Sequence, residues 1–358
     1  MKRQAIKGRG AQSGAVSARF AVPATLPDGD WLDERDSLDG APRPLRTEVT
    51  EEHPRSIISY NSSPDVPFDR SINAYRGCEH GCVYCFARPT HAWLDLSPGL
   101  DFETRLFAKP EAASLLRREL ANPRYKPAPI ALGTNTDPYQ PIERRFRITR
   151  QILELCLETR HPVTITTKSD RVVDDLDVLR ELAQANLVAV AVSVTSLDAR
   201  LSAKLEPRAA APQKRLEALA RLGQSGIHAH CSIAPVIPAI TDAMLEALIA
   251  QAAAAGVRSA SWIPLRLPHE VAPLFREWLE THFPERAGKV MGILREMRGG
   301  RDNDPRFHTR MRPKGVWADL FRARFTLACK REGIAQSAPM LDISRFRPPA
   351  RYGQMSLF

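Results

Sequence analysis

Short, nearly continuous apolar runs alternate with longer amphipathic stretches between residues 65 and 270. The short runs are rich in Val, Ile and Ala, which is typical of strands buried on both faces of a parallel sheet. They predict strands over 71–75, 130–133, 163–167, 188–194, 228–234 and 259–265. In the longer stretches, apolar residues recur every three or four positions, which predicts helices over 110–120, 146–158, 173–183, 213–223 and 242–254.

This alternation of strand and helix predicts βα units and therefore a parallel sheet. A closed barrel of eight such units takes about 250 residues. Six units in about 200 residues instead predict an α/β fold, an open, partial (β/α)6 TIM-type barrel with parallel strands. The long crossover between Cys85 and Ile130 predicts an insertion after the first strand.

Three parts of the chain are expected to differ in structure. Residues 1–55 are rich in Gly, Ala, Pro, Arg and Asp without sustained periodicity, which predicts a mostly disordered N-terminal extension. Residues 56–270 hold the barrel. Residues 271–358 are expected to form a basic, helical C-terminal appendage and tail, with an amphipathic helix over 317–330, that covers the open side of the barrel.

The net charge of +10 is unevenly placed, because the segment from Arg286 to Lys330 holds twelve Lys or Arg against four Asp or Glu. Such a segment suits a nucleic-acid, lipid or phosphorylated partner, and it makes nucleic acid a candidate partner of this chain. The alternative is a solvated basic face without a partner. The chain has no run of eighteen apolar residues and no apolar stretch behind its basic N-terminus. We therefore expect a cytoplasmic protein without a membrane partner.

Cys78, Cys82 and Cys85 form a C-x3-C-x2-C run. A cubane 4Fe-4S cluster usually takes one protein ligand for each of its four irons. Three thiolates therefore leave one iron open for a substrate or cofactor, as in an open catalytic metal site. Gly77 and Gly81 allow the backbone to wrap around such a cluster. Cys156, Cys231 and Cys329 are isolated and are expected to be buried apolar residues.

Two other interpretations of the cysteine run are open. Zinc accepts a Cys3His set, with His80 as the fourth ligand, but four ligands between residues 78 and 85 would crowd one small ion. A redox or nucleophilic cysteine would need only one or two of the thiols. The spacing therefore favours one 4Fe-4S cluster held by the three thiolates.

The run from Gly77 to Cys85 resembles the cluster motif of radical S-adenosylmethionine (SAM) enzymes. Within that superfamily, residues 71–78 followed by 133–143 are similar to an uncharacterised branch of the spore photoproduct lyase-like group, and the resemblance covers about residues 55–335. It implies a six-stranded partial barrel with the cluster at its mouth and SAM on the open iron. Reductive cleavage of SAM to a 5′-deoxyadenosyl radical, hydrogen abstraction from a substrate, and a reductant such as flavodoxin or ferredoxin are implied with it.

The resemblance also implies a set of SAM-binding residues. Tyr84 would lie beside the adenine, and Thr134 and Asn135 near the methionyl amino group. Lys168 and Ser193 end the third and fourth predicted strands, where an ammonium suits a carboxylate and a small hydroxyl suits a ribose. As alternatives, Lys168 is a solvated strand cap and Ser193 is a core serine.

Asp137 is the candidate catalytic or substrate-binding acid, with Glu143 as its alternative, although the segment also suits a simple turn into a helix. Spore photoproduct lyases carry a hydrogen-donor cysteine at the end of the second strand, and this chain has Gly133 there. Because that cysteine is absent, we do not expect repair of thymine dimers by that mechanism. Cys231 would replace it as a catalytic residue if its side chain pointed inward. The remaining alternatives are repair or modification of DNA or RNA, and a non-catalytic, metal-stabilised binding protein.

Overall fold

The computed structural model describes residues 6, 8–15, 17, 19 and 45–350. Its main sheet has seven strands in the order β10-β9-β8-β7-β6-β3-β2. Neighbours from β3 to β10 are parallel, and β2 pairs antiparallel with β3. The strands are β2 (Ser59–Tyr60), β3 (Arg70–Ile72), β6 (Ile130–Leu132), β7 (Val163–Thr167), β8 (Val188–Ser193), β9 (His228–Val236) and β10 (Ser259–Pro264). The predicted open, parallel α/β sheet is therefore confirmed.

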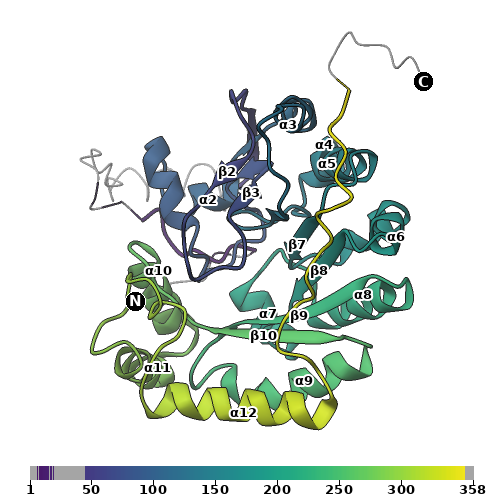
Figure 1. Cartoon of the computed structure of the whole chain (residues 1–358). Helices are drawn as coiled ribbons and strands as arrows, with labels where there is room; N and C mark the ends of the chain where they lie inside the picture. The colour runs from purple at the N-terminus through teal and green to yellow at the C-terminus, as the bar shows by residue number, and fades with distance from the viewer. Residues whose placement is uncertain (1–5, 7, 16, 18, 20–44, 351–358) are drawn as a thin grey trace.

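Helices cover the convex face of this sheet (Figure 1). They are α3 (Ala112–Leu120), α5 (Ile148–Glu158), α6 (Leu176–Gln184), α8 (Pro212–Gln224) and α9 (Leu245–Ala254). Short helices lie between them: α2 (Asp101–Thr104), α4 (Glu143–Phe146), α7 (Ala199–Leu205), and the 3-10 turns η1 (Arg88–Leu94), η2 (Asp170–Asp175) and η3 (Asp242–Met244). Alternate strand residues such as Val163, Ile165 and Val190 pack with these helices into the main hydrophobic core.

The concave face of the sheet carries small and polar side chains, whereas branched aliphatic residues fill a closed barrel. Strand pairing arranges these residues in three rows across the sheet. The rows are Thr164, Ala189 and His228; Thr166, Ala191, His230 and Ser259; and Ser193, Ser232 and Ser261. A polar inner wall of this kind suits a ligand or water, because it does not form a packed apolar core.

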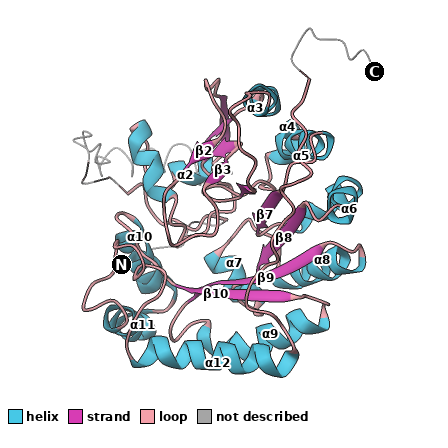
Figure 2. Ribbon diagram, in the orientation of Figure 1, coloured by secondary structure: helices cyan, strands magenta, loops and turns pink. Residues whose placement is uncertain are grey.

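The predicted insertion contributes one strand to a second, three-stranded sheet, which is separate from the main sheet labelled in Figure 2. Its order is β1-β5-β4, with β1 (Glu48–Glu51), β4 (Tyr75–Arg76) and β5 (Arg105–Ala108). The predicted strand 71–75 is therefore divided, because the chain leaves the barrel after β3 and joins this small sheet. Within the predicted N-terminal extension, β1 and the contacts of residues 8–15 described below are ordered; residues 1–5, 7, 16, 18 and 20–44 lie outside the described residues.

The C-terminal appendage contains α10 (Val271–His282), α11 (Pro284–Glu296) and α12 (Val316–Glu332). α10 and α11 form a second hydrophobic cluster with Cys82, Val83 and Tyr84. α12 packs along the outside of α9 (Figure 1), so this helix does not cover the open side of the barrel. The loop before α12 does reach that side, because Arg310 Nε lies 2.5 Å from Asp65 Oδ2 in the β2–β3 loop. Among the described residues, no helix has the length and apolar character needed to cross a membrane.

Candidate metal centre at the cluster loop

The three clustered cysteines lie on one tight loop, residues 77–85, between β4 and η1; we call it the cluster loop. Its turns are closed by Gly81 N donating to Cys78 O at 3.3 Å and by Cys85 N donating to Cys82 O at 3.2 Å. Gly81 has a φ of +67°, which glycine adopts without strain. Cys78 and Cys82 are buried and Cys85 is half-buried. The loop therefore presents three thiols from a fixed backbone at the carboxyl edge of the sheet.

A fully buried ion pair, Arg88 with Glu103, supports the loop from one side. Arg88 Nε donates to Cys82 O at 2.9 Å, and its Nη2 donates to Gly81 O at 3.2 Å. Glu103 also accepts from the backbone N–H groups of Gly10 and Ala11, at 3.1 and 2.8 Å. Residues 8–15 of the N-terminal region, which we call the strap, are thus tied to the cluster loop through the same carboxylate.

A second buried pair, Arg215 with Glu206, lies on the other side. The Tyr84 hydroxyl donates to Glu206, and Thr195 Oγ1 donates to the same carboxylate at 2.8 Å. Arg215 Nη1 donates to Ser193 O at 3.0 Å. Removing one partner of either pair would leave an uncompensated buried charge, so disrupting these supports of the loop would be costly.

Burial controls the protonation of the thiols. It raises the pKa of Cys78 well above its usual value, and it raises the pKa of Cys82 to about 12, although nearby Lys168 acts in the opposite direction. Both thiols therefore retain their protons near neutral pH unless a cationic group binds them. Binding of a metal cluster would displace these protons, as is usual for thiolate ligands.

The donor set fits a cluster better than a single ion. Within the described part of the chain, no three or more His, Cys, Asp or Glu side chains form a group that could hold a metal ion. His80, the candidate fourth ligand for zinc, directs its Nδ1 to Asp137 Oδ2 at 3.2 Å. A 4Fe-4S cluster takes its thiolates at separate iron atoms, so its ligands stand farther apart than those of one zinc ion.

Lys168 and Tyr84 come together beside the cluster loop. The Lys168 ammonium lies 5.8 Å from the centroid of the Tyr84 ring, and within the described residues it makes no hydrogen bond or ion pair. Burial alone would lower the pKa of Lys168, but Cys82 and Glu206 raise it more, and the net direction is upward. The Lys168 side chain is therefore positively charged near neutral pH, and it forms no direct ion pair with a carboxylate of the described residues.

The other predicted cofactor residues lie at the same edge. Asn73 Nδ2 donates to Thr134 Oγ1 at 3.0 Å, and Asn135 N donates to Asn73 Oδ1 at 2.9 Å. Asn135 is exposed and Thr134 is half-buried. Ser193 is buried on the concave face at the end of β8. These contacts fix the loop after β6 and leave the Asn135 side chain accessible.

Asp137 has its carboxylate fully engaged. Its Oδ1 accepts from Thr167 Oγ1 at 2.6 Å and from Tyr139 N at 2.9 Å. Its Oδ2 accepts from Lys168 N at 2.7 Å and faces His80. Burial would raise its pKa, but His80 and these donors lower it to about 2. These contacts fix the Asp137 carboxylate between the end of β7 and His80 of the cluster loop.

The Cys231 side chain does not point inward, so this residue does not meet the condition for a hydrogen donor. It is fully buried on the helix-covered face of β9 and belongs to the main core with Cys329 of α12. The side-chain alternation of a strand explains the difference, because His228 and His230 occupy the concave face instead. Both histidines bond Ser259 Oγ at 2.8 Å. Burial lowers the pKa of His230 to about 4, so its ring is neutral near pH 7.

Several supporting residues were not identified from the sequence. Besides the two Arg–Glu pairs, Gln140 donates to Gly77 O at 3.2 Å and accepts from Glu79 N at 3.0 Å. Gln140 stands in the Thr-Asp-Pro-Tyr-Gln-Pro run, which is the only local signal for its role. Glu143, the alternative acid, instead accepts from Thr149 N at 2.9 Å at the start of α5.

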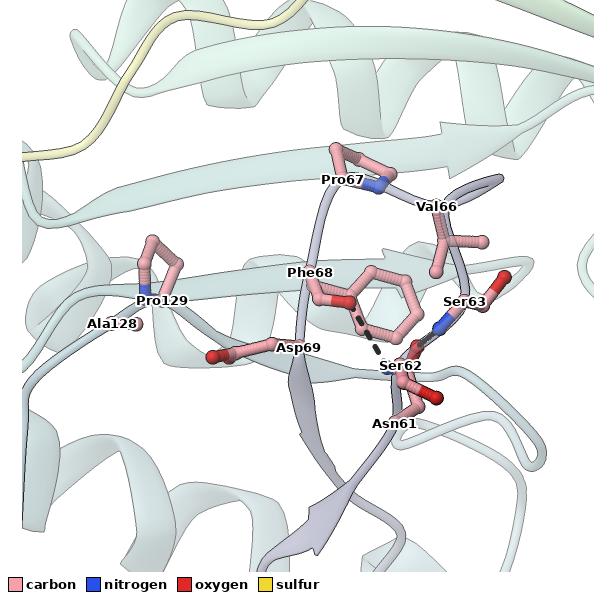
Figure 3. Close-up of a pocket in the computed structure, with 9 residues that line it drawn as sticks. All are labelled: Asn61, Ser62, Ser63, Val66, Pro67, Phe68, Asp69, Ala128 and Pro129. Atoms are coloured by element: carbon pink, nitrogen blue, oxygen red, sulfur yellow. Dashed lines mark hydrogen bonds between the residues drawn. The ribbon is translucent and has the colours of Figure 1, made fainter.

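Two surface hollows differ in the chemistry that they offer. A shallow cleft beside the cluster loop is lined by His80, Arg144, Arg171 and Arg208, among others. Another lies between the β2–β3 loop and residues 128–129 (Figure 3), where the Asn61 side chain donates to Phe68 O at 2.9 Å. Its acidic residue, Asp69, is paired with Arg70. The first hollow therefore lies beside the candidate metal centre, whereas the second hollow offers no reactive group.

Residues 72–252 match the family model of the Radical SAM superfamily. An uncharacterised protein of Mycobacterium tuberculosis is 38% identical over 232 residues, which are 64% of this chain and 68% of that protein. An uncharacterised protein of Methanocaldococcus jannaschii is 27% identical over 60% of this chain and 76% of that protein. A solved variant of spore photoproduct lyase has a TM-score of 0.57 at 15% identity, covering 85% of this chain and 92% of that chain, which shows a shared fold.

Proposed function

The chain belongs to the radical SAM superfamily, and we propose that it is an enzyme that holds one 4Fe-4S cluster on Cys78, Cys82 and Cys85 and binds SAM at the open iron. One observation carries this proposal. The three thiols share a loop that two buried Arg–Glu pairs hold, and the Lys168 ammonium lies beside that loop without a carboxylate partner among the described residues.

When bound, the cluster and SAM would supply radical chemistry, namely reductive cleavage of SAM and hydrogen abstraction from the substrate. The residues of this chain bind and orient. Lys168 is suited to the SAM carboxylate because an ammonium forms a charge-assisted hydrogen bond with it. Tyr84, held by Glu206 and Thr195, offers a fixed aromatic face. Thr134, Asn135 and Ser193 offer small polar groups near the same edge.

The substrate is proposed to occupy the concave side of the sheet, below the cluster loop. That face is lined by Ser, Thr, Ala and His side chains in three rows. Such a wall supplies hydrogen bonds and leaves space, as expected of a ligand site with a few placed polar groups.

A thiol does not serve as hydrogen donor in this proposal. Gly133 has a φ of +86°, and a Cβ on it would lie 2.0 Å from Thr166 O. A cysteine at this position is therefore excluded by the backbone itself. Outside the cluster loop, the chain has Cys156, Cys231 and Cys329, and all belong to the main core behind the sheet. The reaction therefore differs at this step from one that uses a donor cysteine.

The reductant, of the flavodoxin or ferredoxin kind, is proposed to approach the cleft lined by His80, Arg144, Arg171 and Arg208. This cleft adjoins the cluster loop through His80. Arg171 is paired with Asp174 and Arg208 with Glu79, and Asp170 also lines the cleft. A negatively charged partner is therefore proposed to dock at Arg144, because complementary charge raises the rate of association.

Anaerobic reconstitution tests the proposal. We expect a brown protein with four irons per chain that forms 5′-deoxyadenosine when SAM and dithionite are added. SAM should also change the magnetic spectrum of the reduced cluster, since it binds the open iron. A protein that carries four irons but yields no 5′-deoxyadenosine would contradict the proposal, and a colourless protein with one zinc per chain would support a non-catalytic, metal-stabilised binding protein instead.

A further inference from the structure

Three arginines gather where β10 meets the C-terminal appendage: Arg266, Arg298 and Arg310, which we call the arginine cluster. Arg266 lies two residues after the end of β10, and its neighbours Leu265 and Leu267 are buried in the second hydrophobic cluster. Side chains alternate along an extended chain, so Arg266 is directed away from that cluster. Arg298 is only 4% exposed. Arg310 reaches across to Asp65 in the β2–β3 loop. The cluster therefore lies at the seam between the two ends of the open sheet.

Only some of the N–H donors of these arginines form hydrogen bonds. Arg298 donates to Leu265 O at 2.6 Å and to Arg310 O at 3.2 Å. Within the described residues, Arg266 forms one side-chain hydrogen bond, from Nη1 to the Met311 sulfur at 3.1 Å, and a thioether is a weak acceptor. The Nε atoms of Arg266 and Arg298 are buried and have no hydrogen-bond partner among the residues that the structure describes. Buried unpaired donors are costly, so each of these groups calls for an acceptor.

The nearby carboxylates do not balance the charge. Asp65 is occupied by Arg310 and by His308 N at 2.7 Å. Asp304 is occupied by Arg306 at 2.9 Å and by Thr309 at 2.7 Å. Within the described part of the chain, neither Arg266 nor Arg298 forms an ion pair. Burial, followed by repulsion from Arg266, lowers the pKa of Arg298 to about 10, which agrees with an excess of positive charge.

We propose that the arginine cluster binds a phosphate group of the substrate, and that this phosphate belongs to a nucleotide or to a nucleic-acid strand. Guanidinium groups bind phosphate oxygens through paired hydrogen bonds, and phosphate has enough oxygens for the free donors of Arg266 and Arg298. The assignment to a substrate rests on the proposed function; the binding of phosphate does not. It also gives a specific location within the basic segment 286–330, since Arg298 and Arg310 belong to that segment.

Binding measurements on the full chain, purified anaerobically and kept without reductant, test this inference. The probes are cytidine 5′-monophosphate, cytidine, inorganic phosphate and a short single-stranded oligonucleotide. We expect the monophosphate to bind, cytidine to show no measurable binding, and inorganic phosphate to compete with the monophosphate. Tighter binding of the oligonucleotide than of the monophosphate would identify a strand as the source of the phosphate, and the reverse would identify a nucleotide. Equal binding of cytidine and its monophosphate, or no binding of any phosphate probe, would overturn the inference.

Variants locate the binding. Arg266→Gln should weaken monophosphate binding by about tenfold or more, because a charged bidentate contact is lost. Arg301→Gln removes an exposed arginine from the same basic segment and should change the affinity by less than about twofold. Asp65→Asn removes the carboxylate that occupies Arg310 and should tighten binding. Unchanged affinity in folded Arg266→Gln and Asp65→Asn proteins would overturn the inference.

The wild-type probe series decides the question even if a variant does not fold. The same probe series also distinguishes a failure of the phosphate proposal from a failure of the proposed radical SAM function. A chain that binds the phosphate probes but does not cleave SAM would keep the phosphate site and contradict the proposed function.

Discussion

The backbone of Gly10 in the strap packs directly on the cluster loop, where a Cβ on Gly10 would lie 1.7 Å from the carbonyl oxygen of Gly81. Gly10→Ala therefore forces the strap away from the loop, and forced overpacking typically costs about 1–3 kcal/mol. We expect this variant to lose iron-dependent absorbance faster in air than the wild type does. Gly14→Ala is the matched control, because its nearest neighbour is Ser97 Oγ at 3.9 Å. Equal rates of loss in the two variants would show that the strap does not protect the loop.

Alanine at Cys78, Cys82 or Cys85 should abolish cluster binding. Two thiolates cannot hold three irons, so each single variant is expected to lose its brown colour and most of its iron after reconstitution. Cys156→Ala is the control, since Cys156 is fully buried in the main core, far from this loop in the chain. Iron analysis and visible spectra measure the outcome. Retention of wild-type iron by all three variants would refute the assignment of the ligands.

Lys168→Met should weaken SAM binding without removing the cluster. Methionine keeps the length and apolar stem of the side chain and removes the ammonium proposed to meet the SAM carboxylate. Loss of one charge-assisted contact predicts a fall in affinity of about 10- to 100-fold. Equilibrium dialysis measures this with the reconstituted protein. Lys204→Met serves as control, because the Lys204 ammonium lies over Phe283 at 5.0 Å. If both variants bind SAM as the wild type does, Lys168 has another role.

Glu206→Gln tests the buried pair beneath Tyr84. Glu206 and Arg215 are both about 1% exposed or less, and removing one charge leaves the other buried without a partner. Such a change costs about 3–5 kcal/mol, so we expect a large fall in the melting temperature. Glu246→Gln breaks a partly exposed pair with Arg324 and should cost at most about 1 kcal/mol. Similar losses in the two variants would mean that the Glu206 pair is not a major support.

The strands were predictable because parallel strands buried by helices are continuous apolar runs. The alternation of side chains along β9 also predicts which face carries Cys231. Ala229, Cys231 and Ile233 form the apolar set, and His228 and His230 form the polar set on the opposite face. The division of the strand 71–75 had no such signal. Asn73 lies between its two halves and binds Asn135 N and Thr134 after the neighbouring strand β6, and contacts between residues distant in the chain leave no periodicity in the sequence.

The candidate site was predictable where its residues are local. The cysteine spacing and the strand end at Lys168 are visible in the sequence, whereas the supports of the loop are not. Glu103 joins Arg88 on one side and the backbone of Gly10 and Ala11 on the other, across 92 or 93 positions for those two residues. The packing of the strap depends on this tertiary contact, so composition alone suggested disorder there.

Glu143 predicts how stability depends on pH. Burial, opposed by the hydrogen bond from Tyr75 and by the N–H of Thr149, raises its pKa from 4.5 to about 7. Between these values the folded chain binds a proton that the unfolded chain releases. The stability from this group is therefore complete below about pH 4.5 and is lost as the pH rises through 7. A shift of this size corresponds to a loss on the order of 3 kcal/mol.

Glu143→Gln mimics the protonated acid at every pH, so it should remove this loss. We expect the melting temperature of the variant to exceed that of the wild type by more at pH 7.5 than at pH 5, because only the wild type must bury a carboxylate at the higher value. Differential scanning fluorimetry of both proteins in the same buffers measures the difference and cancels the titration of other groups, such as His230. Because Gln has no charge to titrate, an unchanged difference between the two proteins across this range would show that Glu143 is already ionised in the fold, with its carboxylate stabilised by Tyr75 and the start of α5.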